Sequence, residues 1–83
     1  MVKIYSRQEC NACWLAKRQL KKRGIPYQEV AMEESEPEVG EWLKSEGFYS
    51  LPVIEVGEGL LYCYKDLTKV YALIEKAKGE RLD

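Results

Sequence analysis

The sequence predicts a small α/β domain with the element order β-α-β-α-β-β-α. Short runs rich in β-branched and aromatic residues alternate with longer segments in which apolar residues recur at helical spacing. Gly and Pro mark most of the boundaries between these segments. A chain of 83 residues that is 46% hydrophobic and 33% charged fits one ordered unit, so we expect residues 1–83 to form a single domain.

The first part of the chain predicts a strand, a helix and a second strand. Residues 2–5 (VKIY) alternate apolar and polar side chains, which favours a strand. Residues 11–23 contain good helix formers and no breaker, and Gly24 is placed to end this helix. Pro26 then opens a second extended run over residues 26–32.

The middle of the chain predicts a second, shorter helix. Ser35 follows an acidic stretch and is expected to cap this helix, whose first residues would be Glu36 and Pro37. The helix is expected to end at Gly47. Its apolar residues recur at helical spacing, so we expect Trp42 to pack in the core.

The last part predicts a hairpin and a final helix. Strands at 53–56 and 60–64 flank a GEG turn, and Asp66 or Thr68 is placed to cap a helix through Ala77. Because helical segments join the first three strands, we expect those strands to run parallel with right-handed crossovers. The last two strands would be antiparallel.

Charge and composition exclude several functions. A formal net charge of −1 provides no global field for nucleic acid or an anionic membrane. The absence of histidine excludes Ser-His and Cys-His catalysis and His-containing metal sites. The N-terminal MVKIYSRQEC lacks the apolar segment of a secretory signal, and no stretch reaches transmembrane length, so we expect a cytoplasmic protein.

Two of the three cysteines, Cys10 and Cys13, stand where the first strand gives way to the first helix. Unpaired backbone amides and the positive end of the helix dipole favour a thiolate there, which predicts a lowered pKa for Cys10. Arg7 would add to this effect and Glu9 would oppose it. Cys13 follows one turn later on the same face of the helix, close enough for its sulfur to form a disulfide with Cys10.

This arrangement predicts two-step thiol–disulfide exchange. Cys10 would be the nucleophile that forms a mixed disulfide with the substrate, and Cys13 would resolve it. Two alternatives stay open: half of a structural zinc site, and two ordinary cysteines at chance spacing. Since the chain offers only three cysteines and no histidine, a zinc site would need a carboxylate or a second chain.

The segments YSRQECNACWLAKRQLKKRGIPYQEV and GFYSLPVIEV resemble glutaredoxin-like NrdH redoxins of the thioredoxin superfamily. The resemblance covers nearly the whole chain. It implies a thioredoxin fold, with a four-stranded mixed sheet in the order 2-1-3-4 flanked by three helices. It also implies that Leu51-Pro52 is a cis peptide facing the cysteine pair, that the Leu51 backbone pairs with an extended substrate, and that Arg7 is the basic residue near the thiols.

The resemblance also implies electron donation, typically to ribonucleotide reductase, and recharging by thioredoxin reductase in place of glutathione. Tyr49 stands where glutathione-using glutaredoxins often have a basic residue, and residues 62–66 (YCYKD) lack their Gly-Gly-x-Asp loop. These departures favour thioredoxin reductase as the reductant. Because Arg7 matches a basic position near the thiols and Asp66 can still act as an anion-balancing or capping residue, a glutathione-dependent glutaredoxin is the first alternative. A Cys-ligated metal or iron–sulfur module is the second. We expect no cofactor, no metal, no nucleic acid, no membrane and a monomer.

Three further features carry two interpretations each. Cys63, where the family more often has glycine, is either a third thiol beside the site or a small buried residue. Trp14 shapes a docking surface or covers the helix flank. The cluster Lys21-Lys22-Arg23 is a solvated helix end or a surface for an acidic partner.

Overall fold

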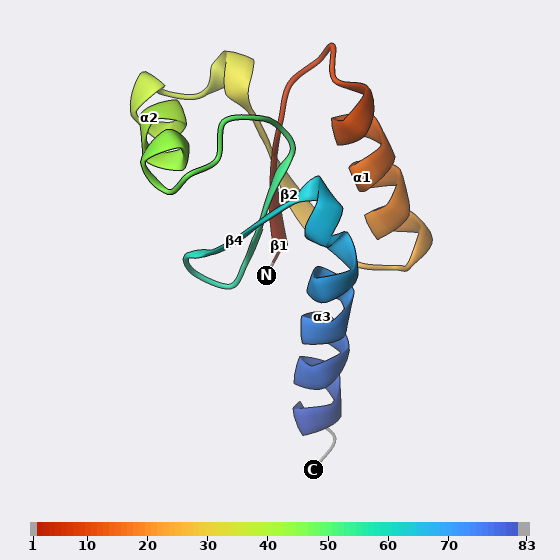
Figure 1. Cartoon of the computed structure of the whole chain (residues 1–83). Coiled ribbons are helices and arrows are strands. Elements are labelled where there is room, and N and C mark those ends of the chain that lie inside the picture. The colour runs from red at the N-terminus through yellow and green to blue at the C-terminus, as the bar shows by residue number, and fades with distance from the viewer. Residues whose placement is uncertain (1, 82–83) are drawn as a thin grey trace.

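A four-stranded sheet in the order β2-β1-β3-β4 organises the computed structural model, which describes residues 2–81 and the side chains of residues 2–77 (Figure 1). This order and the element sequence confirm the predicted thioredoxin fold. The strands are β1 (Val2–Ser6), β2 (Tyr27–Ala31), β3 (Val53–Val56) and β4 (Leu60–Cys63).

The direction of β3 corrects the prediction that the first three strands are parallel. β1 and β2 are parallel, but β1 and β3 are antiparallel. Ala31 at the end of β2 is in register with Ser6, and Val53 at the start of β3 with Tyr5. The connection over residues 32–52 therefore leaves and rejoins the sheet at the same end. A parallel β3 would require this connection to carry the chain back along the whole length of the sheet. The observed connection stays at one end, so β3 runs antiparallel to β1.

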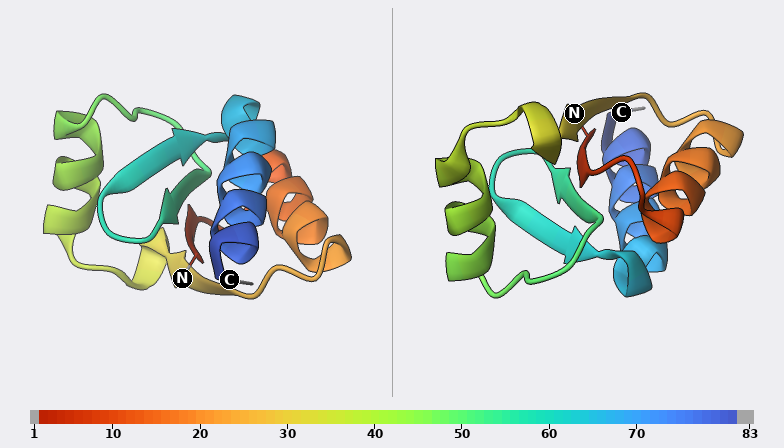
Figure 2. Two further views of the ribbon diagram at one scale, coloured as in Figure 1. Left: turned by 90° about the horizontal axis from the view of Figure 1, so that it is seen from below. Right: turned by 90° about the horizontal axis from the view of Figure 1, so that it is seen from above.

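Helices cover both faces of the sheet. Helices α1 (Asn11–Lys22) and α3 (Leu67–Arg81) lie on one face, and α2 (Pro37–Ser45) lies on the other (Figure 2). Alternating residues of β1 serve the two sides, so that Ile4 packs in the core under α1 and α3 while Tyr5 packs in the core under α2. The first core also contains Ala16, Leu20, Ile54, Leu67 and Val70, and the second contains Leu43 and Val53.

The ends of α1 follow the sequence signals closely. The helix begins directly after Cys10, whose extended backbone makes it the N-cap residue, and Arg23 is the C-cap residue. Gly24 follows with φ of +69°, a left-handed conformation that other residues adopt at a cost. The predicted helix over 11–23 is therefore confirmed to within one residue.

Helix α2 begins one residue later than predicted. Glu36 is its N-cap residue and Pro37 its first helical residue, while Ser35 closes the short 3-10 helix Met32–Glu34. The prediction that Trp42 packs in the core is wrong, since the residue is 37% exposed. Leu43 fills the buried position of the helix, and the Trp42 ring contacts the ring of Tyr5 edge to face, with the centroids 6.0 Å apart.

The C-terminal half contains one shorter strand and one longer helix than predicted. β3 and the turn have the predicted bounds, but β4 ends at Cys63 because Tyr64–Asp66 forms a 3-10 turn. Helix α3 then extends to Arg81, past the predicted end at Ala77. None of the helices within residues 2–81 is long and apolar enough to cross a membrane.

A buried carboxylate in β3 has no counterpart in the sequence predictions. Glu55 is 8% exposed; its Oε1 accepts a hydrogen bond from the Tyr5 hydroxyl at 2.6 Å, and its Oε2 accepts one from the Gly59 amide at 2.9 Å. Burial raises the pKa of Glu55, but these hydrogen bonds and the charge of Lys3 outweigh it and leave the pKa below its ordinary value. Burial, followed by Glu55 itself, raises the pKa of Tyr5. The pair joins β1 to the β3–β4 hairpin.

Candidate active site

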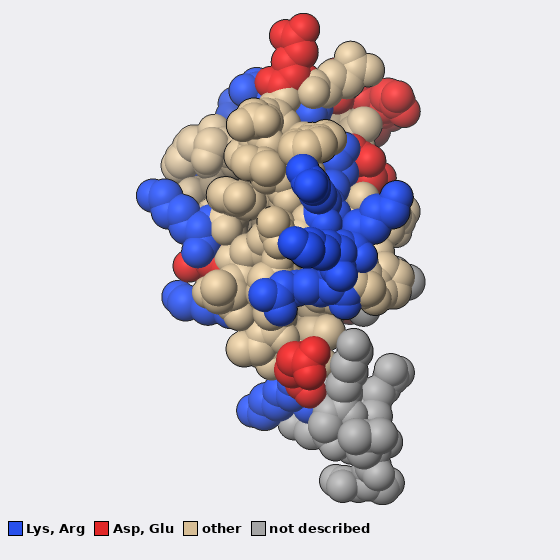
Figure 3. All heavy atoms as spheres, turned by 90° about the vertical axis from the view of Figure 1, so that its right-hand side faces the viewer, with Lys and Arg blue, Asp and Glu red and all other residues tan. Residues whose placement is uncertain are grey.

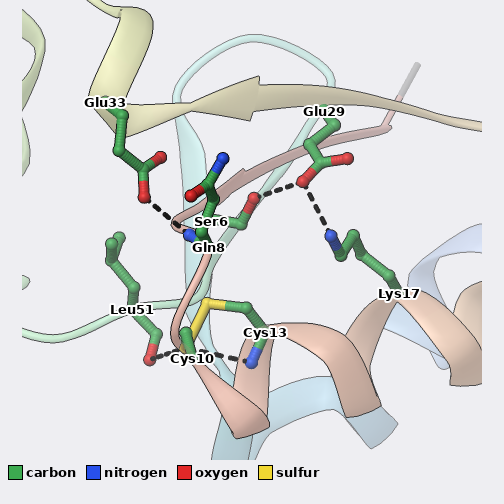
Figure 4. Close-up of a disulfide and its surroundings, with 8 residues drawn as sticks. All are labelled: Ser6, Gln8, Cys10, Cys13, Lys17, Glu29, Glu33 and Leu51. Atoms are coloured by element: carbon green, nitrogen blue, oxygen red, sulfur yellow. Dashed lines mark hydrogen bonds and ion pairs between the residues drawn. A yellow bond between two sulfur atoms is a disulfide. The ribbon is translucent and has the colours of Figure 1, made fainter.

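Cys10 and Cys13 form a disulfide at the start of α1, with their Cα atoms 5.2 Å apart (Figure 4). The predicted spacing on one helix face therefore does bring the two sulfurs together. The loop over residues 7–9 leads from the end of β1 to Cys10, so the sheet fixes where the helix begins. The site thus lies at the end of the sheet where β1 and β2 finish and β3 starts.

Cys10 occupies the N-cap position with its sulfur turned back onto the helix. The backbone amide of Cys13 donates to Cys10 Sγ at 3.1 Å, and the amide of Trp14 donates to the Cys10 carbonyl oxygen at 3.1 Å. The first amides of a helix have no partner within the helix, so a thiolate at this place meets both a donor and the positive end of the dipole. The physical conditions that favour an anionic sulfur are therefore present at Cys10.

The two cysteines differ in exposure. Cys13 is 1% exposed, whereas Cys10 is half-buried and open to solvent on one side. An incoming disulfide can reach Cys10 but not Cys13 without displacement of the helix. Cys10 is therefore the accessible cysteine of the pair, a difference that the positions of the two residues in the sequence did not establish.

The Leu51-Pro52 peptide lies beside the active site, with the Leu51 carbonyl oxygen facing Cys10, as the resemblance implied. The peptide bond between them is cis, and Pro52 is buried. The Leu51 carbonyl oxygen lies 3.7 Å from Cys10 Sγ (Figure 4). Leu51 itself is half-buried and packs at the edge of the α2 core.

Arg7 is exposed on the loop before Cys10 and lines a cavity of about 350 Å³ beside Leu51. Lys44 from α2 contributes a second cation to this cavity, whose remaining walls are Met32, Gly40, Leu43, Phe48, Tyr49 and Ser50. Glu33 Oε2 accepts a hydrogen bond from the backbone N–H of Gln8, in the same loop, at 2.6 Å. That bond, with a smaller effect of Arg7, lowers the pKa of Glu33.

A polar network beside the disulfide was not predicted. Glu29 Oε2 on β2 accepts a hydrogen bond from Ser6 Oγ at 2.6 Å and pairs with Lys17 Nζ at 2.7 Å (Figure 4). The bond from Lys17, followed by the bond from Ser6, lowers the pKa of Glu29. Lys17 lies one turn beyond Cys13, so the network fastens the active-site end of α1 to both parallel strands. The sequence showed Glu29 only as part of an acidic stretch, and no motif pointed to its partners.

Cys63 combines parts of both predicted roles. It is half-buried on β4 in register with Val53, the residue that follows Pro52, and its Sγ lies 3.3 Å from Asp66 Oδ2. It therefore lies near the site but is held by Asp66. Among the side chains of residues 2–77, no group of three or more His, Cys, Asp or Glu residues is placed to hold a metal ion.

Comparisons with known proteins agree with this geometry. A family model described as Glutaredoxin matches residues 2–61. The chain is 33% identical over 57 residues to the glutaredoxin-like protein NrdH of Escherichia coli strain K12, which covers 69% of each protein. The structure of this chain is similar to that of the NrdH-redoxin from Escherichia coli, with a TM-score of 0.67 and 32% identity. The match covers 75% of this chain and 79% of that one.

The fold also extends to a glutaredoxin proper. The solution structure of glutaredoxin from Brucella melitensis matches with a TM-score of 0.64 and 29% identity, covering 98% of this chain and 85% of that one. The family match, the NrdH relatives and the Cys10–Cys13 disulfide at the start of α1 agree with one another. The chain therefore belongs to the glutaredoxin family of thiol–disulfide oxidoreductases and is related to its glutaredoxin-like NrdH members.

Proposed function

We propose that the chain is a dithiol electron carrier that reduces protein disulfides, with Cys10 as the nucleophile and Cys13 as the resolving thiol. The observation that carries this proposal is the Cys10 sulfur at the helix N-cap. The Cys13 amide donates to it at 3.1 Å, and the sulfur is the accessible member of the pair. An anionic, reachable sulfur beside a buried second thiol is what two-step exchange requires.

The exchange transfers two electrons from the dithiol to the substrate. Cys10 thiolate attacks one sulfur of the substrate disulfide, which forms the Cys10–substrate bond and expels the other substrate sulfur as a thiolate that takes up a proton. Cys13 then loses its proton and attacks Cys10 Sγ. This step forms the Cys10–Cys13 disulfide and releases the second substrate sulfur as a thiol. The substrate disulfide is reduced and the pair is oxidised.

Leu51 and Arg7 would hold the substrate during this exchange. The Leu51 carbonyl lies 3.7 Å from Cys10 Sγ, which supports pairing of its backbone with an extended substrate segment. Arg7 lines the adjoining cavity, where a cation would contact the same segment. Pro52 fixes the direction of the backbone at Leu51.

We further propose that ribonucleotide reductase is a client, that a thioredoxin reductase recharges the pair, and that the protein works in the cytoplasm. The relationship to NrdH supports the first two points. The Escherichia coli NrdH-redoxin, to which the structure is similar, has a thioredoxin-like activity profile. No metal or other cofactor is needed for the exchange.

Glutathione is the alternative reductant, and one observation favours it. Arg7 and Lys44 place two cations around the cavity beside Leu51, and cations bind the carboxylates of a peptide such as glutathione. Exposed Tyr49 occupies the same wall without adding charge. The two reductants therefore need a direct comparison.

NADPH oxidation with a protein disulfide as the final acceptor separates these proposals. One arm contains thioredoxin reductase, and the other contains glutathione with glutathione reductase. We expect turnover in the first arm to exceed that in the second. Turnover with glutathione alone would contradict the thioredoxin reductase proposal.

Cysteine variants test the assigned roles in the same assay. Cys10→Ser is expected to abolish exchange, and Cys13→Ser to accumulate a mixed disulfide with the substrate that mass spectrometry detects. Cys63→Ser is the matched control and should retain turnover. A mixed disulfide trapped on Cys13 in the Cys10→Ser protein would contradict the proposed order of attack.

A further inference from the structure

The net charge of −1 conceals a strong separation of charge along the chain. Residues 10–28 contain five Lys and Arg residues and no Asp or Glu. Residues 33–46 contain six Glu residues and one Lys. The first stretch forms α1 and the second forms α2 with the 3-10 helix before it. Helices α1 and α2 lie on opposite faces of the sheet (Figure 2). The basic stretch and the acidic stretch of the sequence therefore lie on opposite sides of the sheet.

The cations of α1 form a continuous exposed surface. Figure 3 shows Lys and Arg side chains gathered on the side of the molecule that carries α1. Arg18, Lys21 and Lys22 are exposed, and none of the ion pairs found among residues 2–77 includes them. Lys17 is neutralised by Glu29, and the Arg23 guanidinium stacks over the Tyr71 ring at 3.8 Å. Within α1, the cations without a carboxylate partner among residues 2–77 are therefore Arg18, Lys21 and Lys22.

This charged surface is continuous with the disulfide through Trp14. Trp14 follows Cys13 directly and is 54% exposed, a large aromatic surface for a free protein. The Arg18 guanidinium lies 5.3 Å from the centre of its ring, so the cation is held beside the aromatic surface. A shallow hollow lined by Trp14, Lys17, Arg18, Lys21, Tyr27 and Glu29 continues along the helix, and its one carboxylate, Glu29, is paired with Lys17. We call Trp14, Arg18, Lys21 and Lys22 the α1 basic face.

We propose that the α1 basic face docks an acidic segment of the protein whose disulfide is exchanged at Cys10. This inference rests on the proposed function and adds the charge of the partner to it. A partner bound at Cys10 has Trp14 next to it and the three cations beyond. The Glu residues of α2 and of the 3-10 helix Met32–Glu34 would repel the same acidic segment, so the charge separation also selects the side on which the partner lies.

The helix geometry sets where the acidic residues should lie. Helix α1 rises about 1.5 Å per residue, so Arg18 and Lys22 lie roughly 12 and 18 Å along the axis from Cys10. An extended partner segment advances about 3.3 Å per residue. Acidic residues about three to six positions from the partner cysteine would therefore meet the cations.

Three synthetic peptides test this inference. Each has one cysteine in a mixed disulfide with 2-mercaptoethanol and carries three Glu, three Gln or three Lys at positions three to six from the cysteine. The measured quantity is the second-order rate constant for reaction with the reduced protein, obtained by acid quench and chromatography at about 20 mM and about 300 mM salt, which bracket strong and weak screening. We expect the Glu peptide to react about tenfold faster than the Gln peptide at low salt and the Lys peptide to react more slowly than both. At high salt the three rates should converge.

Matched charge reversals locate the effect. The R18E/K21E protein is expected to lose the preference for the Glu peptide or reverse it. The K69E/K76E protein changes the net charge equally through exposed residues of α3 and should retain the preference. Equal rates for the three peptides with the wild type would overturn the inference, and so would an equal loss of preference in both variants. Binding of a DNA oligonucleotide that R18E/K21E abolishes, without any peptide preference, would assign the face to nucleic acid and also overturn it.

An uncharged substrate separates this inference from the proposed function. Bis(2-hydroxyethyl) disulfide carries no charge, so the wild type and both variants should reduce it at equal rates. Failure of the wild type to reduce it would contradict the proposed function itself. Normal reduction of this compound without peptide selectivity would overturn only the docking inference.

Discussion

The amide of Cys13 donates a hydrogen bond to the sulfur of Cys10 at 3.1 Å, while the sulfur of Cys13 is itself almost wholly buried. One residue thus supplies both the group that stabilises charge on its partner and the thiol that later attacks it. The backbone acts on Cys10 from the N-terminal end of α1, whereas the Cys13 side chain points toward the protein interior. The two cysteines are therefore chemically unequal although only two residues separate them.

This inequality predicts the order of alkylation in the reduced protein. Iodoacetamide at pH 7 should modify Cys10 first, because its thiolate is stabilised and reachable. Cys13 should react last, since it is 1% exposed. Half-buried Cys63 is expected to react at an intermediate rate. Peptide mapping by mass spectrometry at increasing times measures the order, and preferential labelling of Cys13 would refute it.

Loss of the Glu29 network should reduce stability only at neutral pH. The pKa of Glu29 is lowered by Lys17 and Ser6, so its stabilising effect is present above the unfolded value of about 4.3 and is lost as the pH falls through the folded value. Because the carboxylate is 41% exposed, we expect Glu29→Gln to cost at most about 1 kcal/mol at pH 7. Urea unfolding at pH 7 and pH 3 tests this. Glu41→Gln, an exposed change, is the control, and an equal loss at both pH values would contradict the account.

Removal of the Tyr5 hydroxyl should destabilise the sheet. Tyr5→Phe leaves Glu55 buried with one fewer hydrogen-bond donor, and we expect a cost of about 1 to 2 kcal/mol in urea unfolding at pH 7. The pKa of Tyr5 is raised in the folded protein. Its contribution to the free energy of unfolding is therefore complete below the pKa of about 10 in the unfolded chain, and is lost as the pH rises through the pKa in the folded protein. Tyr49→Phe, at a residue that is 79% exposed, serves as the control. Equal stability of the two variants would show that the buried pair contributes nothing.

Two glycine substitutions should have opposite effects. Gly24→Ala forces a side chain into a φ of +69°, and we expect a loss of about 1 kcal/mol even though no atom obstructs the new Cβ. Gly40→Ala lies within α2, where the new Cβ would meet Met32 Cε at 3.8 Å, an ordinary contact. It should therefore stabilise the protein by about 0.5 to 1 kcal/mol. Thermal unfolding of both variants measures the difference, and a stabilised Gly24→Ala protein would contradict the backbone argument.

Local patterns predicted the elements and the cysteine pair well. Apolar alternation and helix formers set the bounds of α1 and β3 to within a residue, and the position of Cys10 at a helix start followed from the same pattern. The direction of β3 did not follow, because it depends on the path of residues 32–52 in space and not on which elements they contain. Trp42 was misplaced for a related reason, since spacing along a helix does not fix which of two neighbouring residues points at the sheet.

Interactions that depend on register were also beyond the sequence. The Tyr5–Glu55 pair requires the antiparallel register of β1 and β3, and the Ser6–Glu29 bond requires the parallel register of β1 and β2. Nothing local distinguishes Glu29 from its acidic neighbours. The cis peptide before Pro52 was anticipated only through the family resemblance, because Leu-Pro alone does not specify it.

The central claim is that the start of α1 holds the Cys10 sulfur as an anion. Ultraviolet absorbance of the thiolate at 240 nm, followed from pH 3 to pH 10 in the reduced Cys13→Ser/Cys63→Ser protein, measures the pKa of Cys10 directly. The account predicts a midpoint clearly below the value of about 8.5 for a free cysteine. A midpoint at or above that value would mean that the helix does not activate the sulfur, and the proposed order of attack would lose its physical basis.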